Sequence, residues 1–255
     1  MNDLFETKNI KPMLIGEEND AFDSKDYIYE LKLDGERCIA YLDPENGTEL
    51  RNKRNVKMLP KVPELSEIHR QVKFRCILDG ELAVIKDGKP DFSEIQRRSM
   101  MTNRLKIELA SKQYPACFTA FDILYYQDHS VNLLPLMERK KLLDEVIISD
   151  SARFAKSRYI EEKGIAFYKL AEQRDLEGIV AKRKGGLYHI GKRTRDWLKI
   201  KVMQDEDLLV LGYQPDEGGK VKDLILGYYD EEGKLQCRGK VYLGISEEER
   251  RIIEN

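Results

Sequence analysis

Two strand-like segments that flank an Asp-Gly pair constrain this chain more than any other feature. The segments are Tyr27–Leu33 and Glu36–Leu42, and Asp34-Gly35 lies between them. Aromatic and branched apolar residues favour extended strands, and an Asp-Gly pair is typical of a two-residue turn. The sequence therefore predicts a tight β-hairpin over residues 27–42.

The predicted hairpin places two positive charges opposite each other. With Asp34-Gly35 as the turn, Lys32 pairs with Arg37, on the strand face that also carries Glu30. Like charges directly opposite each other destabilise a hairpin, so a purely structural protein gains nothing from them. A lysine beside a fixed positive charge loses its proton more readily and becomes a better nucleophile. Lys32 is therefore a candidate nucleophile, and a pair of exposed surface charges is the alternative.

Composition excludes several classes of protein. The chain has 255 residues, of which 41% are hydrophobic, and this suffices for a packed core. No segment approaches the roughly 20 apolar residues that a membrane helix needs, and the first residues lack the apolar segment of a secretory signal. The cysteines show no zinc-site spacing, so we expect buried, reduced thiols in a cytoplasmic protein. They are Cys38, Cys76, Cys117 and Cys237.

Positive charge is concentrated in two segments although the net charge is only −2. Residues 51–61 contain five Lys or Arg and no acid, and residues 182–201 contain eight against the single acid Asp196. Local basic segments can bind phosphate backbones even in a nearly neutral protein. An ordinary solvated face remains the alternative for each segment.

Carboxylates next to glycine mark two further strands. Asp79 and Glu81 flank Gly80 in an apolar segment, and Glu177 precedes Gly178 in another. A glycine in a strand permits close approach of a ligand, and carboxylates bind cations, so these acids are candidate site residues. Solubility of an edge strand is the alternative.

The segment from residue 197 to 202 has two different faces. Alternation puts Trp197, Lys199 and Lys201 on one face and Leu198 and Ile200 on the other, which we expect to be core. Two lysines that point the same way from a strand suit a polyphosphate, whereas an amphipathic strand without a ligand is the alternative.

The chain divides at about residue 202, where its composition becomes acidic. Helices are predicted over residues 135–146 and 161–174 in the first part. The second part is predicted to contain strands at 208–213, 224–229 and 235–243, and a helix over 246–253 in which Ser246 and Glu249 form a capping box.

Six motifs in order give the sequence a specific resemblance. The chain resembles the covalent nucleotidyltransferase superfamily, and within it the ATP-dependent DNA ligases of bacterial end joining and small bacterial or prophage ligases. The resemblance covers about residues 10–202. The motifs are Lys32-Leu33-Asp34-Gly35-Glu36-Arg37, Arg54-Asn55, Leu78-Asp79-Gly80-Glu81-Leu82, Phe121-Asp122, Glu177-Gly178-Ile179-Val180-Ala181-Lys182 and Trp197-Leu198-Lys199-Ile200-Lys201. Lys53 and Val56 depart from the second motif, where Ser and Gly are usual.

The resemblance implies an α+β fold. Residues 1–202 would form an ATP-grasp-like adenylation domain of antiparallel sheets with flanking helices. Residues 203–255 would form a short OB-fold β domain, which we expect to be incomplete because only about 50 residues follow Lys201 and a five-stranded barrel needs more. The basic last motif of the family, which orients the departing pyrophosphate, is not recognisable here.

The resemblance also implies a role for each candidate residue. Lys32 would become joined to AMP from ATP, with Mg²⁺ or Mn²⁺ as the metal. Lys199 and Lys201 would act on the α-phosphate. The remaining nucleotide contacts would be Glu30 to the adenine amine, Leu31 beside it, Phe121 to the adenine ring, Glu81 to the ribose, Arg37 and Arg54 to phosphates, and Glu177 to the metal, with Glu81 as a second metal ligand.

The implied partner is nicked double-stranded DNA, bound by a cytoplasmic monomer without a membrane. Two alternatives stay open. One is an RNA ligase or guanylyltransferase of the same superfamily. The other is a DNA- or nucleotide-binding module that does not complete turnover, because the last motif is missing.

Overall fold

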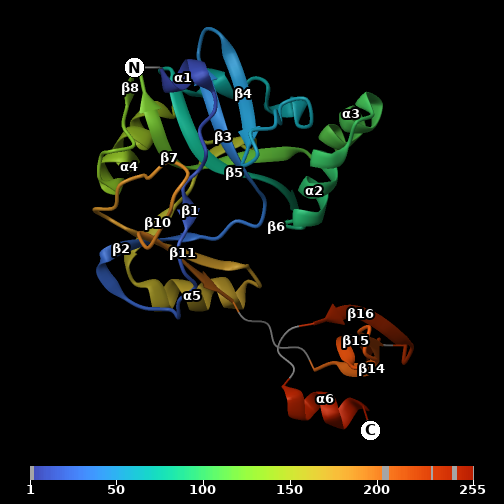
Figure 1. The fold of residues 1–255 in the computed structure, drawn as a ribbon. Coiled ribbons are helices and arrows are strands. Elements are labelled where there is room, and N and C mark those ends of the chain that lie inside the picture. Colours follow the sequence, from blue (N-terminus) through green and yellow to red (C-terminus); the bar gives the residue numbers. More distant parts are fainter. Residues whose placement is uncertain (1–2, 203–206, 231, 243–245, 255) are drawn as a thin grey trace. The chain divides into compact units, whose positions relative to one another are not determined.

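The structure of the chain is a computed structural model that describes residues 3–202, 207–230, 232–242 and 246–254. It divides into two compact units, Met1–Val202 and Met203–Asn255, which are considered separately. The first unit contains two main sheets, one above the other in Figure 1, with helices on their outer sides. Their strands pair antiparallel, except for the short strand Phe154–Lys156 of the larger sheet, which pairs in parallel. The α+β adenylation fold predicted for this part is confirmed by the comparisons with solved structures given below.

The larger sheet has the strand order β4-β3-β5-β7-β8. Its central strands are buried on both faces, which agrees with their almost continuous apolar sequence. The strands are β3 (Glu36–Asp43), β4 (Gly47–Asn52), β5 (Cys76–Lys86), β7 (Ala116–Tyr126) and β8 (His129–Ser130), with β6 (Lys89–Pro90) paired to β5 and β9 (Phe154–Lys156) paired to β7.

The smaller sheet has the order β10-β2-β11-β13. Helix α5 (Gly164–Gln173) covers its outer face, where Ala171 packs against Tyr29 and Ile179. A short parallel pair, β1 (Leu14–Ile15) with β12 (Arg193–Thr194), ties the N-terminal segment to this region. The strands of the sheet are β2 (Ser24–Leu31), β10 (Tyr159–Glu162), β11 (Gly178–Arg183) and β13 (Trp197–Lys201).

The predicted hairpin over residues 27–42 is wrong. Strand β2 pairs with β10 and β11, whereas β3 pairs with β4 and β5, so the two strands belong to different sheets. Asp34-Gly35 lies in the crossing between the sheets instead of in a tight turn. A Cβ atom on Gly35 would lie 2.2 Å from the Leu82 carbonyl oxygen, so glycine is needed for close packing at this point.

Three helices of the first unit have clear N-terminal signals. Pro135 precedes α4 (Leu136–Val146), as predicted. The Asp91 and Asn103 side chains accept hydrogen bonds from backbone amides and so cap α2 (Phe92–Met100) and α3 (Arg104–Gln113), which the sequence analysis did not predict. The helix predicted at 161–174 begins later, because residues 161 and 162 belong to β10. The remaining short helices are α1 (Leu4–Thr7), η1 (Pro63–Leu65) and η2 (Ile68–Gln71).

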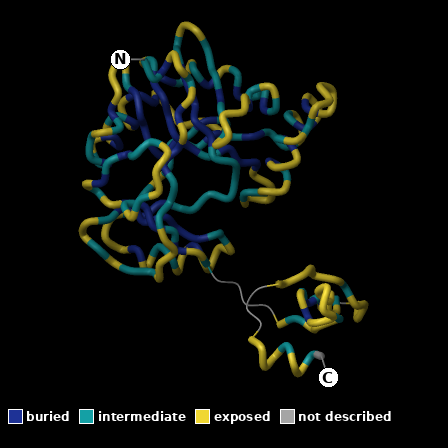
Figure 2. The backbone as a smooth tube through the Cα atoms, viewed as in Figure 1, coloured by how far each residue is buried: buried dark blue, intermediate teal, exposed yellow. Residues whose placement is uncertain are grey.

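The core of the first unit runs along both sheets, as the dark blue segments in Figure 2 show. Few charged side chains lie within it. Arg139 and Asp122 are both completely buried and form a two-bond ion pair of 2.7 and 2.9 Å. Arg139 also donates to the carbonyl of Gly186, which anchors the loop between β11 and β12.

The second unit contains a three-stranded antiparallel sheet and one helix among its described residues. The strands are β14 (Leu209–Pro215), β15 (Val221–Tyr229) and β16 (Leu235–Val241), and the helix is α6 (Glu247–Glu254). These agree with the predicted elements, although residue 243 of the predicted third strand lies outside the described residues. Ser246 and Glu249 form the predicted capping box. The OB-fold assignment stays a prediction.

None of the helices in the described ranges is long and apolar enough to span a membrane. All four cysteines are free, but the prediction that all are buried is wrong, because Cys237 is exposed and Cys117 is only partly buried.

Candidate active site

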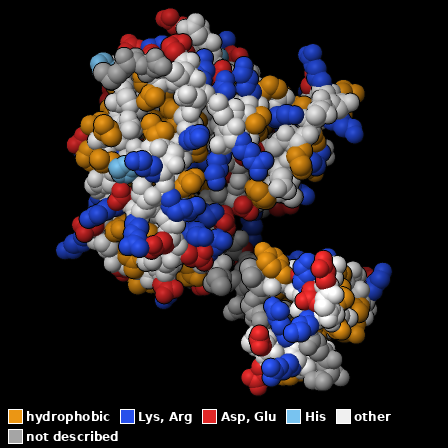
Figure 3. Space-filling view, viewed as in Figure 1, with side chains coloured by type: hydrophobic (Ala, Val, Ile, Leu, Met, Phe, Trp, Pro, Cys, Tyr) orange, Lys and Arg blue, Asp and Glu red, His pale blue; other side chains and the backbone are white. Residues whose placement is uncertain are grey.

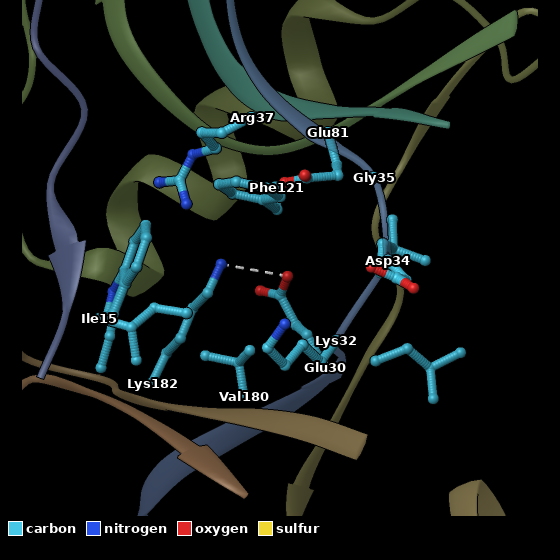
Figure 4. A pocket seen from close by; sticks show the side chains of 13 residues that line it. Ile15, Glu30, Lys32, Asp34, Gly35, Arg37, Glu81, Phe121, Val180 and Lys182 are labelled. Carbon is cyan, nitrogen blue, oxygen red and sulfur yellow. Dashed lines mark hydrogen bonds and ion pairs between the residues drawn. The ribbon is translucent and has the colours of Figure 1, made fainter. Parts of the chain in front are cut away.

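A cavity of about 220 Å³ lies between the two sheets of the first unit. Figure 4 shows side chains from both sheets pointing into it, with Arg37 and Phe121 on one side and Val180 and Lys182 on the other. The lining residues are Ile15, Glu30, Leu31, Lys32, Leu33, Asp34, Gly35, Arg37, Glu81, Phe121, Val180, Lys182 and Trp197.

Lys32 lies at the start of the crossing between the sheets. Its backbone amide donates to the carbonyl of Gly178 at 2.9 Å, which fixes the residue at the edge of the smaller sheet. Its ammonium group forms an ion pair with Glu177. Gly178 has a φ of +137° and its Cβ position would lie 2.2 Å from the Ile200 carbonyl oxygen, so only glycine fits beside Glu177. The ion-pair partner of Lys32 is therefore an acid. The hairpin prediction placed Arg37 opposite Lys32 and is wrong on this point.

One end of the cavity contains a buried ionic cluster. The Glu30 carboxylate forms ion pairs with Lys140 at 2.5 Å and with Lys182 at 3.1 Å, and all three side chains are at most 4% exposed. Burial alone would raise the pKa of Glu30, but the two lysines outweigh it and hold that pKa below its usual value. Burial lowers the pKa of Lys182 to about 8. Glu30 is thus a fixed negative charge inside the cavity.

Aromatic rings form the wall next to this cluster. Phe121 and Trp197 meet edge to face at a centroid distance of 5.9 Å. The Lys182 ammonium lies 4.3 Å from the centroid of each ring, so it contacts Glu30 and both rings at once. Lys140 donates to the Phe121 carbonyl at 2.8 Å, which links the position of the ring to the ionic cluster.

Arg37 is held by a buried acid behind the cavity. Its Nε and Nη2 atoms donate to the two oxygens of Asp79 at 2.5 and 2.6 Å, and Asp79 is completely buried. The guanidinium lies 4.4 Å from the centroid of Phe121, and its Nη1 atom, which Asp79 does not use, can face a ligand. This two-bond geometry fixes both the position and the orientation of a permanent positive charge.

Two other carboxyl groups line the cavity near Lys32. Burial raises the pKa of Glu81 to about 8, and the Asp79 charge adds to this while Arg37 opposes it. The pKa of Asp34 is raised too, by burial and by the charge of Glu177. Both groups therefore hold a proton more readily than a solvated acid does.

A second cavity of about 230 Å³ shares Ile15 and Arg37 with the first. Its positive charges come from Arg37, Lys53, Arg193 and Lys199. Lys199 forms an ion pair of 2.9 Å with Glu18, which lies on the N-terminal segment next to β13.

The structure brings together most of the predicted site residues. Glu30, Leu31, Lys32, Arg37, Glu81 and Phe121 line the first cavity, and Glu177 reaches it through its pair with Lys32. Three residues lie elsewhere: Lys199 lines the second cavity, while Lys201 and Arg54 are exposed and line neither.

The sequence analysis missed several residues of the site. Lys182 and Trp197 belong to the motifs that begin at Glu177 and at Trp197, but the sequence predicts no role for either. Both line the cavity. Lys140 was given no role either, because a lysine in a helix is usually exposed, and the fold shows that its ammonium reaches Glu30.

The comparisons with known proteins agree with this geometry. Residues 12–201 match the family described as ATP dependent DNA ligase domain. The chain is 30% identical over 205 residues to the SPbeta prophage-derived DNA ligase-like protein LigB of Bacillus subtilis, covering 80% of this chain and 72% of that protein. It is 30% identical over 206 residues to the Bifunctional non-homologous end joining protein LigD of the same organism, covering 74% of this chain but only 34% of LigD.

A solved structure described as mycobacterial DNA ligase D complexed with ATP and MES has the same fold. It superposes with a TM-score of 0.66 at 24% identity, covering 97% of this chain and 77% of that one. The sequence match extends over all six motifs and over every residue that lines the first cavity. The chain therefore belongs to the ATP-dependent DNA ligase family.

Proposed function

We propose that this protein seals nicks in double-stranded DNA by way of AMP joined to Lys32. The observation that carries the proposal is the placement of Lys32 at the mouth of a cavity whose other end is built for a nucleobase. A binding cavity and a nucleophile in one site are what a covalent nucleotidyl transfer requires.

The buried end of the cavity fits adenine. Phe121 from one sheet and Val180 from the other offer apolar faces for a flat ring, with Leu31 beside them. The Glu30 carboxylate would accept hydrogen bonds from the exocyclic amine, and Lys182 would donate to a ring nitrogen. Guanine presents the opposite pattern of donors and acceptors on the equivalent edge, so the same pair would disfavour GTP.

Glu81 is placed to contact the ribose. With its pKa near 8, the carboxyl is mostly protonated at neutral pH, and it can then both donate to and accept from sugar hydroxyls. A protonated carboxyl is a poor metal ligand, so Glu81 fits the ribose contact better than the metal contact.

Glu177 fits a divalent cation. Its Oε2 atom is buried and has no hydrogen-bond partner, and its Oε1 atom holds Lys32. In residues 3–202, 207–230, 232–242 and 246–254, no group of three or more His, Cys, Asp or Glu side chains forms a metal cage. Mg²⁺ commonly binds through one carboxylate, substrate phosphates and water, which agrees with a single acid. When bound, such an ion supplies positive charge that neutralises the phosphate oxygens.

The first chemical step follows from the position of Lys32. Its Nζ atom must leave Glu177 and release one proton to water before it can attack the α-phosphate of ATP, and a second proton is released to water as the phosphoramidate forms. The N–P bond forms as the bond from the α-phosphorus to the bridging oxygen breaks, and pyrophosphate departs. Arg37 is placed to hold a phosphate oxygen during this exchange, and Lys199 and Lys201 are proposed to reach the α-phosphate from β13.

The second cavity fits a phosphate of the DNA. Four cations surround it, and Arg37 belongs to both cavities, so a 5′-phosphate held there would lie next to the AMP on Lys32. AMP would pass to this phosphate, and the 3′-hydroxyl of the nick would then attack it and release AMP. Figure 3 shows Lys and Arg side chains gathered across the face of the first unit that is turned to the viewer. Arg54 is proposed to contact the phosphate backbone, and binding should weaken with salt.

The alternatives make different predictions. An RNA ligase would seal nicks in RNA faster than nicks in DNA, and a guanylyltransferase would label Lys32 from GTP. A binding module without turnover would bind nicked DNA and form no AMP adduct. The Glu30–Lys182 pair favours ATP over GTP, and the match to the ATP-dependent DNA ligase family supports DNA as the substrate. We propose that the protein acts as a cytoplasmic monomer.

Intact-protein mass spectrometry after incubation with ATP and Mg²⁺ tests the proposal. Wild-type protein should gain one AMP, and Lys32→Ala should gain none. Protein that arrives already adenylated is first discharged with pyrophosphate. The adduct should then seal a nicked DNA duplex without added ATP. If the discharged wild-type protein gains no AMP, the proposal is wrong for this chain.

A further inference from the structure

The buried hydroxyl of Tyr188 links Asp79 and Met13, the two residues that accept hydrogen bonds from the Nη2 atom of Arg37. Besides its bond to Asp79, the Nη2 atom of Arg37 donates to the carbonyl oxygen of Met13 at 3.3 Å. The Tyr188 hydroxyl donates to the same Asp79 oxygen at 2.5 Å and accepts from the Met13 amide at 2.8 Å. The four groups form a closed ring of hydrogen bonds.

Each part of this ring comes from a different segment of the chain. Arg37 lies on β3 and Asp79 on β5, whereas Met13 belongs to the N-terminal segment and Tyr188 to the loop between β11 and β12. Asp79, Met13 and Tyr188 are all 0% exposed, so water does not replace a bond that is lost. The tyrosine hydroxyl contacts both of the other two segments that hold Arg37.

Tyr188 itself is held rigidly. Its backbone amide donates to the carbonyl of Asn132 at 2.9 Å, and its ring meets Trp197 edge to face at 5.7 Å. Trp197 in turn lines the proposed adenine cavity. A hydroxyl fixed from behind in this way can transmit its position to the acceptors of Arg37, because the backbone, the ring and the hydroxyl of Tyr188 each have a partner.

We propose that Tyr188 is a positioning residue that orients the Arg37 guanidinium toward substrate phosphates. The proposal rests on the proposed function, because it takes Arg37 to hold a phosphate oxygen. Without the hydroxyl, one Asp79 oxygen loses a donor and the buried Met13 amide loses its acceptor. Arg37 keeps its charge but loses its fixed orientation, and misplacement of a binding group lowers the rate of the step that it serves.

The test uses Tyr188→Phe with Tyr41→Phe as a matched control. Tyr41 is equally buried, and its hydroxyl also accepts from the N-terminal segment, from the Ile10 amide at 3.2 Å, but Asp79 is not among its partners. We expect Tyr188→Phe to slow single-turnover adenylation of Lys32 and sealing of a pre-adenylated nick by about 10-fold. Tyr41→Phe should change either rate less than about twofold.

A double-mutant cycle separates positioning from general stability. If Tyr188 acts through Arg37, the Tyr188→Phe substitution should add little to Arg37→Lys, so the two effects are strongly non-additive. Equal effects of Tyr188→Phe and Tyr41→Phe, or full additivity with Arg37→Lys, would overturn the proposal.

A measurement that needs no catalysis distinguishes this proposal from the proposed function. In protein with ¹⁵N-labelled arginine, the Arg37 Nε–H signal, identified by its loss in Arg37→Lys, reports how firmly Asp79 holds it. Its exchange with water should become at least about 10-fold faster in Tyr188→Phe and stay unchanged in Tyr41→Phe. Unchanged exchange in Tyr188→Phe would refute the positioning role even if the wild type seals DNA, and faster exchange would support it even if sealing fails.

Discussion

The two ends of the nucleotide cavity hold their charges in opposite ways. At the base end, Glu30, Lys140 and Lys182 are 3–4% exposed, and both lysines form ion pairs with Glu30. At the phosphate end, Lys32 and Glu177 are 20% and 26% exposed, and Lys199 and Glu18 are 31% and 47% exposed. Water can reach the second set and cannot reach the first.

This difference separates recognition from exchange. Separating buried charges from their partners strongly destabilises a protein. The ionic cluster at the base end should therefore stay intact, and the base end should keep its shape with or without a nucleotide. Partly exposed ion pairs contribute little free energy and separate easily. At the phosphate end, the carboxylates of Glu177 and Glu18 occupy positions next to lysines that are proposed to bind phosphate, and the substrate must take their place.

The largest expected effect lies at the phosphate end, at Glu177. Glu177→Gln keeps the size of the side chain but removes the charge that is proposed to hold the metal and that pairs with Lys32. We expect adenylation of Lys32 to slow by about 100- to 1,000-fold, as when a group that stabilises the transition state is lost. Single-turnover adenylation over a range of Mg²⁺ concentrations measures this.

A matched substitution is Glu161→Gln on β10, whose carboxylate pairs with Lys184 at the surface. It should leave the rate within about twofold of the wild type. A Glu177→Gln enzyme with the wild-type rate would contradict the proposed metal contact.

The next largest effect is expected at the base end, where one substitution should weaken both ATP binding and the stability of the fold. Lys182→Met removes one of the two cations that pair with Glu30 but keeps an apolar chain between Phe121 and Trp197. We expect ATP to bind about 10-fold or more weakly, and the free energy of unfolding to fall by about 1–3 kcal/mol, because a buried carboxylate loses a partner. Calorimetric titration with ATP and urea unfolding measure the two quantities.

Lys184→Met serves as the control. Lys184 lies two residues after Lys182 and forms a partly exposed ion pair with Glu161. If both lysine variants lose the same stability, the distinction between buried and exposed pairs fails at this site.

A smaller effect concerns the pH dependence of stability, through Glu81. Its pKa is about 8 in the folded protein and near the ordinary 4.5 in the unfolded chain. Because the folded pKa is raised, the contribution of the protonated group is complete below about pH 4.5 and is lost as pH rises through 8. Compared with Glu81→Gln, the wild type should lose about 1–2 kcal/mol of unfolding free energy from pH 5 to pH 8, since part of the side chain reaches solvent.

Urea unfolding of both proteins at several pH values measures this difference. Parallel stability curves for the wild type and Glu81→Gln would show that Glu81 ionises like a solvated acid.

The smallest effect should come from the Lys199–Glu18 pair, which is more exposed than the Lys32–Glu177 pair. Glu18→Gln releases Lys199 from a carboxylate that competes with phosphate, so pyrophosphate and ATP should bind about twofold to fivefold more tightly. Glu17→Gln is the control, because Glu17 is its neighbour and pairs with Arg195 instead of Lys199. Weaker binding in Glu18→Gln would mean that Glu18 aligns Lys199 and does not compete for it.

The sequence predicted correctly those features that depend on neighbouring residues alone. Alternation along β13 predicted correctly that Trp197 and Lys199 face the opposite way from Leu198 and Ile200, because period two needs only neighbouring residues. The same reasoning failed for residues 27–42. An Asp-Gly pair permits a hairpin but does not require one, and here the pairing of β2 with β11 and of β3 with β5 prevails.

The buried partners of the site were beyond prediction for a related reason. Lys140 and Tyr188 are joined to the cavity by contacts between residues far apart in the chain, and Tyr188 lies 109 positions from Asp79, the acid to which it donates. A lysine or tyrosine in such a place looks like a surface residue until the fold is known. Local patterns thus predicted the groups that face the ligand better than the groups that hold them.

The four residues that cross between the sheets should tolerate no change in length. Residues 32–35 connect the end of β2 to the start of β3. Lys32 is tied to Gly178 on one side, and Gly35 is pressed against Leu82 on the other. A deletion would pull Lys32 or Gly35 away from these contacts, since each residue reaches at most about 3.6 Å. An insertion would add slack directly beside the nucleophile and displace it, so a loop that looks permissive should be among the least permissive segments of the protein.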